Sequence, residues 1–382
     1  MKWMPLVLAL VMTGPASAWE LSQVERPLGG ASGVRETRWS LGREPGGSHD
    51  RIQVHRYRGS APTRAVLLYL PGTNMNGHAA VTSENHNLWL FLARRGVEVW
   101  ALDYRTHFVS PESSAEEHGF MAAWTLESFV EDARVAAAFA RAESGFASLF
   151  VAGFSRGVTL AYALACVEPP GTVAGLVVLD GVFKNHAAQA SSDAEARRAP
   201  RPGKGPHSTD VAGGIGWERR HQLMSAAASN PLAPSPDPAF ERVGDQVSAI
   251  LYGAWRPGGL ADPVHGVSRV EVLARLLDGY DRYWPAIQNV EGRRLASRLD
   301  DPETPIDDAW GDLSLPILYF GATGMGPDWI LDGIHSAVES GSEDVTLHVL
   351  EGYGHLDVLV GERAAAEVFE PTAAWMLERA KR

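Results

Sequence analysis

Leu149-Phe150-Val151-Ala152-Gly153-Phe154-Ser155-Arg156-Gly157 is the stretch that decides the fold of this 382-residue chain. An apolar run leads into a Gly-x-Ser-x-Gly motif, which opens a helical pattern of small residues over Val158 to Val167. This order predicts a sharp strand-to-helix turn that strains the backbone of Ser155 and exposes its hydroxyl above a sheet. Glycines suit the turn because a Cβ two residues before or after Ser155 would collide with neighbouring elements. We predict that Ser155 is a nucleophile; the alternative is a Gly-rich surface turn with a capping serine.

Strands and helices alternate around this motif. Ala65 to Leu70 is a continuous apolar run, typical of a strand buried on both faces, and further strands are predicted at Val97 to Leu102, Val173 to Leu179, Pro316 to Gly321 and Val345 to Leu350. Helical periodicity appears at Leu88 to Arg95, Leu126 to Ala142 and Ala364 to Ala380. Two alternating segments, Val34 to Trp39 and Ile52 to Tyr57, predict antiparallel strands near the N-terminus. We therefore expect an α/β protein with a mostly parallel central sheet flanked by helices.

The alternation stops for more than a hundred residues after Asp180-Gly181. Residues 182–315 are predicted to form an inserted, mainly helical cap, with core segments at 19–181 and 316–382. Two Pro-rich stretches in the insertion, Ala199 to Pro206 and Asn230 to Pro238, favour loops. An amphipathic helix is also expected there, with one apolar face formed by Val270, Leu273, Leu276, Leu277, Tyr280 and Trp284.

The N-terminus has the pattern of a secretory signal peptide. Lys2 precedes an apolar stretch from Trp3 to Met12, and an A-x-A pattern ends at Ala18. We expect residues 1–18 to be cleaved after Ala18 and the protein to be secreted or periplasmic. No later segment offers about 18 consecutive apolar residues, so no integral membrane association is expected.

Charge and cysteine content restrict the partners and cofactors. The chain has 34 Lys and Arg residues against 46 Asp and Glu, a net charge of −12, which argues against nucleic acid and anionic lipid as partners. Cys166 is the single cysteine, so no intramolecular disulfide can form, and we expect a buried, inert thiol. The sequence lacks H-E-x-x-H, C-x-x-C and P-loop motifs, so no metal or other cofactor is predicted.

A serine nucleophile needs a base and a carboxylate that orients the base. Of the 13 histidines, His355 follows the last predicted strand, where a sheet of this kind gathers its site. At this point the chain resembles the α/β-hydrolase fold superfamily. The resemblance rests on Leu70-Pro71-Gly72-Thr73, Asp103-Tyr104-Arg105, the Ser155 motif and Gly352-Tyr353-Gly354-His355. It implies an α/β-hydrolase fold with the order serine, acid, histidine, and His355 as the base.

The resemblance places the acid after the strand that precedes the histidine strand, which selects Asp328. An N-cap or turn role is the alternative for Asp328. Asp332 is the nearest alternative. Asp180 is the alternative if the acid instead follows the preceding strand. Asp357 lies too close to His355 in sequence to orient it easily.

The resemblance also implies an oxyanion hole formed by two backbone N–H groups. One comes from Arg156, directly after the nucleophile, and the second from Thr73, with Asn74 possible. Thr73 and Asn74 can also be ordinary turn residues.

The function implied is that of a secreted serine hydrolase, carboxylesterase-like or lipase-like, that cleaves small-molecule or lipid-like carboxylic esters through an acyl-enzyme. The same fold also hosts amidases, lactonases and acyltransferases, and these remain alternatives. A catalytically silent protein that holds a ligand under the cap is a further alternative.

Overall fold

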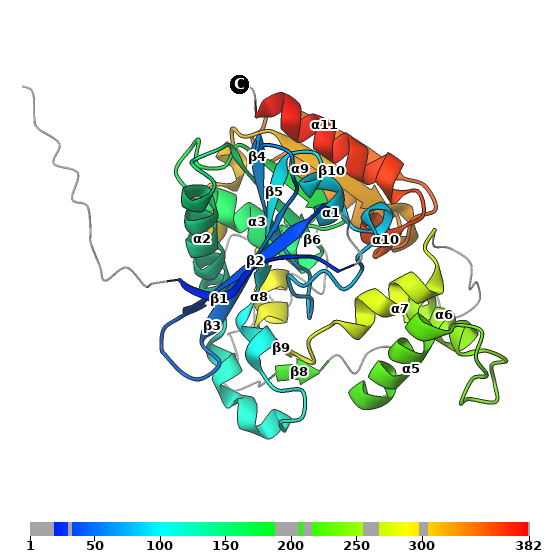
Figure 1. Ribbon diagram of the computed structural model, residues 1–382. Coiled ribbons are helices and arrows are strands. Elements are labelled where there is room, and N and C mark those ends of the chain that lie inside the picture. The colour runs from blue at the N-terminus through cyan, green and yellow to red at the C-terminus, as the bar shows by residue number, and fades with distance from the viewer. Residues whose placement is uncertain are drawn as a thin grey trace, which may run out of the picture.

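A nine-stranded mixed sheet forms the centre of the molecule in the computed structural model, which describes residues 19–29, 33–187, 206–208, 216–254, 267–297 and 305–380 (Figure 1). The predicted signal peptide and most of the Ala199 to Pro206 stretch lie outside these residues. In spatial order the strands are β1 (Glu20–Pro27), β2 (Arg35–Gly42), β3 (Arg51–Arg58), β5 (Val97–Asp103), β4 (Ala65–Leu70), β6 (Leu149–Phe154), β7 (Gly175–Leu179), β10 (Ile317–Ala322) and β11 (Val345–Leu350).

The sheet is parallel from β5 to β11 and antiparallel from β1 to β5. Strands β4, β5, β6, β7 and β10 are buried at every position, as expected of strands that are covered on both faces. The predicted α/β class and mostly parallel sheet are therefore confirmed.

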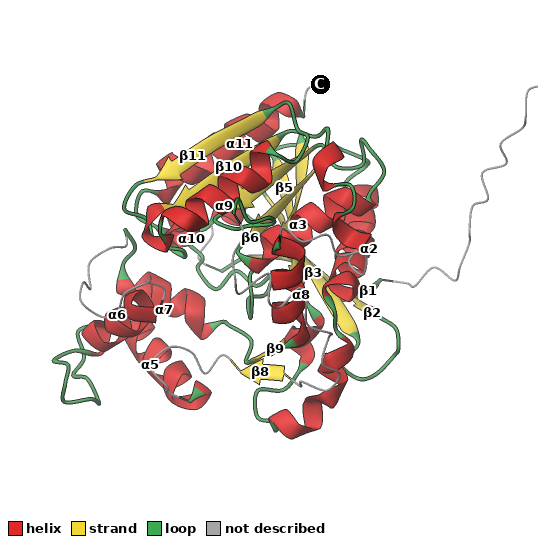
Figure 2. Cartoon of the chain, turned by 180° about the vertical axis from the view of Figure 1, so that it is seen from behind, coloured by secondary structure: helices red, strands yellow, loops and turns green. Residues whose placement is uncertain are grey.

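Helices cover both faces of the sheet, and successive strand residues alternate between two apolar cores. Leu67 and Tyr69 pack with α1 (Leu88–Ala93) and α11 (Glu370–Arg379) on one face. Val66 and Leu68 pack on the other face with α2 (Leu126–Glu143), α3 (Arg156–Val167) and α9 (Pro327–Val338). Figure 2 shows this layered arrangement from behind. Because both faces are covered, the ends of the strands remain as the place for a site.

Four helices lie between β7 and β10 in the described part of the chain. They are α5 (Trp217–Ser229), α6 (Val243–Ala254), α7 (Val270–Asp278) and α8 (Ile287–Ala296). Two short strands in the same part of the chain, β8 (Pro206–Ser208) and β9 (Tyr283–Pro285), pair with each other as an antiparallel ribbon. Helices α5, α6 and α7 pack on one another beyond the edge of the sheet (Figure 2), whereas α8 contacts α2. The described part of this insertion is mainly helical, as expected, and its role as a cap stays a prediction. No helix among the described residues is long and apolar enough to cross a membrane.

The predicted face from Val270 to Trp284 is wrong in its second half. Helix α7 ends at Asp278 with Gly279 as its C-cap, and Tyr283 and Trp284 belong to β9. Both aromatic side chains are buried against the core. They are apolar because they lie in a buried strand, and they do not extend the apolar face of α7. At the C-terminus, the predicted helix from Ala364 is present and begins with a π-helical turn over Ala365–Phe369 that leads into α11.

A buried chain of charged groups ties the antiparallel strands to the loop after β4. Asp103, at the end of β5, accepts hydrogen bonds from His55 Nε2 at 2.8 Å and from the backbone N–H of Gly77 at 2.7 Å. His55 Nδ1 donates to Glu36 at 2.8 Å, so both ring nitrogens face carboxylates. Burial opposes the charge on His55, but Asp103 and Glu36 outweigh it and raise its pKa. The imidazolium therefore links β2, β3 and β5.

His107 continues this network towards the insertion. Its Nδ1 donates to Asp281 at 2.9 Å, and its Nε2 lies 3.8 Å from Asp103. Burial lowers the pKa of His107, but the two carboxylates more than offset burial and raise the pKa to about 9. The ordinary value is 6.5, so folding favours the protonated ring.

We predict that the free energy of unfolding falls as the pH rises from about 6.5 to about 9. Below pH 6.5, His107 is protonated in both the folded and the unfolded state, and its full contribution to stability is present. Between about pH 6.5 and 9 only the folded state keeps the proton, so the contribution of His107 is lost as the pH rises. His107→Gln is expected to reduce this slope in urea unfolding followed by circular dichroism. His348→Gln is the control, because burial lowers the pKa of His348 and moves its titration below the window. An unchanged slope in His107→Gln contradicts the prediction.

Candidate active site

Ser155 lies at the strained turn that the sequence predicts. It follows β6 and precedes α3, with φ 54° and ψ −119°, a backbone conformation that residues other than glycine rarely adopt. A Cβ on Gly157 would lie 1.9 Å from the carbonyl oxygen of Leu70, and one on Gly153 would lie 2.2 Å from that of Gly157. The two glycines are therefore required by close packing of α3 against β4 and β6.

Backbone strain gathers at this edge of the sheet. Four described non-glycine residues have positive φ, and three of them, Asn74, Ser155 and Asp180, follow the neighbouring strands β4, β6 and β7. Strained residues persist only where the surroundings hold them, and they concentrate at functional sites. This edge is also where open α/β sheets bind ligands.

His355 and Asp180 form a buried pair. His355 Nδ1 donates to Asp180 Oδ2 at 2.6 Å, and both side chains are buried. The other oxygen of Asp180 accepts from the backbone N–H of Ala322 at 2.8 Å and from Trp329 Nε1 at 3.1 Å. Ala322 N and Trp329 Nε1 thus fix the carboxylate, and the carboxylate in turn fixes the imidazole.

The imidazole of His355 lies close to the Ser155 turn. Its ring centroid is 4.6 Å from that of Phe154, the residue before Ser155, and 5.8 Å from that of Trp329. Trp329 and Ser155 line the same cleft. The strand-end loops therefore bring the predicted nucleophile and base to one corner of the sheet.

The structure places the other two predicted acids elsewhere. Asp328 is exposed in the first turn of α9, whose N-cap is Gly326. Asp332 Oδ1 accepts from the backbone N–H and Nδ1 of His186, both at 2.7 Å. Among the described residues, the carboxylate on His355 Nδ1 is that of Asp180, the alternative acid, and not that of Asp328, the first choice from the sequence. Asp180 follows β7, and β7 is adjacent to β10 in the sheet. The sequence does not reveal that these two strands are neighbours.

The loop after β4 lies directly against Ser155. A Cβ on Gly72 would come within 3.1 Å of Ser155 Cβ. Thr73 and Arg156, whose N–H groups are the predicted oxyanion donors, line the cleft beside Ser155. Asn74 is tied to the insertion: its carbonyl oxygen accepts from Asp281 N at 2.7 Å, and its Nδ2 donates to Asp281 O at 3.1 Å.

Asn76 adds to this tether. Its Nδ2 donates to Gly279 O at 2.9 Å and to Asp281 Oδ1 at 3.0 Å. Sequence reasoning missed these contacts because they join residues about two hundred positions apart.

The cleft has a volume of about 390 Å³, within the range of small-molecule sites. It is lined by Thr73, Ser155, Arg156, Thr159, Val182, Asn185, Gly292, Arg293, Ala296, Met325, Asp328, Trp329 and Asp332. The insertion supplies one wall through α8, and α9 supplies another.

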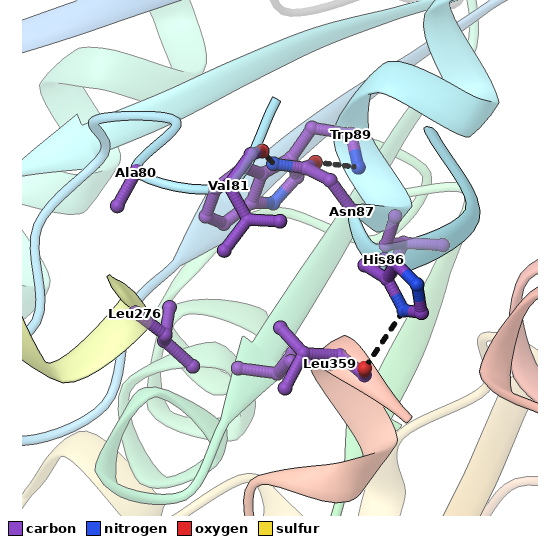
Figure 3. A pocket seen from close by; sticks show the side chains of 9 residues that line it. Ala80, Val81, His86, Asn87, Trp89, Leu276 and Leu359 are labelled. Carbon is purple, nitrogen blue, oxygen red and sulfur yellow. Dashed lines mark hydrogen bonds between the residues drawn. The ribbon is translucent and has the colours of Figure 1, made fainter. Parts of the chain in front are cut away.

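A second cavity lies between α1, α7 and α10 (Asp357–Val360), and Figure 3 shows its lining, which includes Trp89, Leu276 and Leu359. Its volume of about 20 Å³ holds about one water molecule. His86, at its rim, donates from Nδ1 to Val360 O at 3.0 Å. This cavity is too small for an organic substrate.

One group of described residues has the composition of a metal site. Ligand atoms of Glu36, His55 and His78 lie within 4.8 Å of one another. Both nitrogens of His55 are already hydrogen-bonded to carboxylates, and Arg38 donates twice to Glu36. A cation there would compete with the Arg38 guanidinium, so we assign the group a structural role.

Comparisons with known proteins agree with this architecture. Residues 61–202 match the family model described as serine aminopeptidase, S33. A candidate lipase from Sulfolobus solfataricus is 23% identical, with a TM-score of 0.71 over 95% of this chain and 99% of that protein. A highly thermostable carboxyl esterase from Bacillus coagulans is 13% identical, with a TM-score of 0.54 over 90% and 99%. Brefeldin A esterase, a bacterial homologue of human hormone sensitive lipase, is 16% identical, with a TM-score of 0.50 over 94% and 81%.

Comparison with curated protein sequences gives no match. The sheet order, the Ser155 turn and the structural relatives together show that this chain has the α/β-hydrolase fold.

Proposed function

We propose that this protein is a serine hydrolase that cleaves carboxylic esters through an acyl-enzyme. The observation that carries the proposal is the strained Ser155 in an open cleft, beside an imidazole whose Nδ1 is held by a buried carboxylate. A carboxylate on Nδ1 fixes the tautomer whose Nε2 can accept a proton, which is what a serine nucleophile requires.

The reaction follows from the roles of these groups. Ser155 Oγ attacks the ester carbonyl while His355 Nε2 accepts its proton, and the N–H groups of Arg156 and Thr73 hold the oxyanion. His355 returns the proton to the leaving alcohol, which leaves an acyl-Ser155 ester. Water then attacks this ester with His355 as base, and the acid is released.

Asp180 is the acid in this proposal, in place of Asp328. Its contact with His355 and the two further donors on its other oxygen support the role. Asp328 is exposed at the cleft, where it can contact substrate.

The choice of esters rests on the relatives, which are named as a carboxyl esterase, a brefeldin A esterase and a candidate lipase. The matched family model is named for serine aminopeptidases, so an amidase is the second candidate. Peptide p-nitroanilides and p-nitrophenyl esters assayed side by side separate the two.

We predict that Ser155→Ala lowers kcat on p-nitrophenyl butanoate by about 10⁶-fold, because the nucleophile is lost. Labelling of the wild-type protein by a fluorophosphonate probe is expected to vanish in the same variant. Ser229→Ala, at an exposed serine of α5, is the matched control and should retain both signals. A wild-type protein that neither takes the probe nor cleaves esters or amides favours the silent ligand-binding alternative.

Asp180→Asn and Asp328→Asn test the acid directly. An amide at position 180 cannot hold the productive tautomer of His355, so we expect kcat to fall by about 10³- to 10⁴-fold. Asp328→Asn is expected to change kcat by less than about 10-fold. Melting temperatures of both variants verify the fold, and the reverse order of effects would restore Asp328 as the acid.

Export is proposed from the sequence alone. Residues 1–18 have the features of a cleavable signal peptide. We predict that the protein recovered from the medium or periplasm begins at Trp19, as read by N-terminal sequencing. A protein retained in the cytoplasm with Met1 or Lys2 at its N-terminus contradicts this prediction.

A further inference from the structure

The side chain of Arg156 is a cationic group in the cleft that the mechanism above does not use. Only its backbone N–H has a proposed role, yet its guanidinium also lies at the wall of the cleft, one residue from Ser155. Within the described residues, the guanidinium has no hydrogen-bond or ion-pair partner, and its Nε is buried and unpaired. A buried N–H donor without a partner is costly, so the position of this side chain requires an explanation.

The structure holds this guanidinium in place by packing. Gly292 lies within α8, and a Cβ on it would come 1.8 Å from Arg156 Nη1. A glycine inside a helix weakens that helix, and here its missing side chain provides the notch that seats the guanidinium. The side chain is therefore oriented before any ligand arrives.

The surroundings of Arg156 favour an incoming anion. Burial, and next the positive charge of Arg293, lower the pKa of Arg156 to about 10, so the group stays charged at neutral pH. Arg293 lines the same cleft. The negative charge of Glu291 opposes this lowering of the Arg156 pKa, and the Glu291 carboxylate accepts a hydrogen bond from Leu126 N at 2.7 Å.

The acidic residues of the cleft lie on another element. Asp328 and Asp332 belong to α9, and Asp332 is hydrogen-bonded to His186. The cleft thus has a cationic wall from α3 and α8 and an acidic wall from α9. A ligand with one anionic end can be oriented between them.

We infer that the Arg156 guanidinium is a specificity-determining group that binds a carboxylate carried by the substrate, at a distance from the ester that Ser155 attacks. The preferred substrate is then a monoester of a dicarboxylic acid. The planar guanidinium donates two parallel hydrogen bonds to a carboxylate, which a neutral acyl chain cannot accept. This inference rests on the proposed function and adds to it the substrate class.

The test compares p-nitrophenyl monoesters of glutaric and adipic acid with the same compounds methylated at the distal carboxyl. We expect the wild-type protein to prefer the ionised monoester in kcat/KM. Arg156→Met is expected to reduce the ratio of the two kcat/KM values by about 10- to 100-fold, and Arg156→Lys by less, because lysine keeps the charge and loses the fork. Arg134→Met, at an exposed arginine of α2, is the matched control and should leave the ratio unchanged.

A second measurement is independent of chemistry. Binding of the intact glutarate monoester to Ser155→Ala is measured by calorimetry, with and without Arg156→Met. Loss of binding in the double variant supports the anion site even if no ester proves to be a substrate of the wild-type protein. Ester hydrolysis that depends on Ser155, with a ratio and a binding constant that Arg156→Met changes by less than about twofold, overturns the inference and leaves the proposed function intact.

Discussion

Close packing at the N-terminus of α3 is the constraint on which the site depends. The helix begins so near the end of β4 that Gly157 has no room for a side chain, since a Cβ there would lie 1.9 Å from Leu70 O. The chain can turn from β6 into α3 within this space only with Ser155 in a strained backbone conformation. The same proximity brings the loop after β4 against Ser155. Nucleophile and candidate oxyanion donors are thus positioned by one packing contact, and the core on both faces of the sheet stabilises that contact.

Asp180 has a comparable role on the other side of the cleft. It follows β7 with φ 46°, and its carboxylate joins the last backbone N–H of β10, the Trp329 indole of α9 and the His355 imidazole after β11. The three strands are adjacent, so one short side chain reaches all three partners. A carboxylate with this many donors is well suited to hold an imidazole in one orientation.

The sequence was sufficient where the signal is local. Ala65 to Leu70 is predicted with its observed bounds, because a strand buried on both faces is a continuous apolar run between turn residues. Ser155 and His355 could be proposed as site residues for the same reason, since each follows a recognisable strand. The strand Glu20–Pro27 was missed because it is exposed along most of its length and has no apolar face. The carboxylate beside His355 depends on which strands are neighbours in the sheet, and the guanidinium seat at Gly292 depends on how α8 meets α3. Neither relation leaves a periodic pattern in the chain.

The double contact between Asn74 and Asp281 affects how the insertion can vary between related proteins. The segment after α7 is hydrogen-bonded to the loop that carries Thr73, through Asn74 and Asn76. An insertion that moved as an independent flap would pull on this loop with every opening. Grafting an insertion of different length onto this core would release the same loop unless both asparagines were redesigned with it. The two parts of the chain are therefore expected to evolve together, and new substrate ranges should arise through changes in the α8 wall sooner than through replacement of the whole segment.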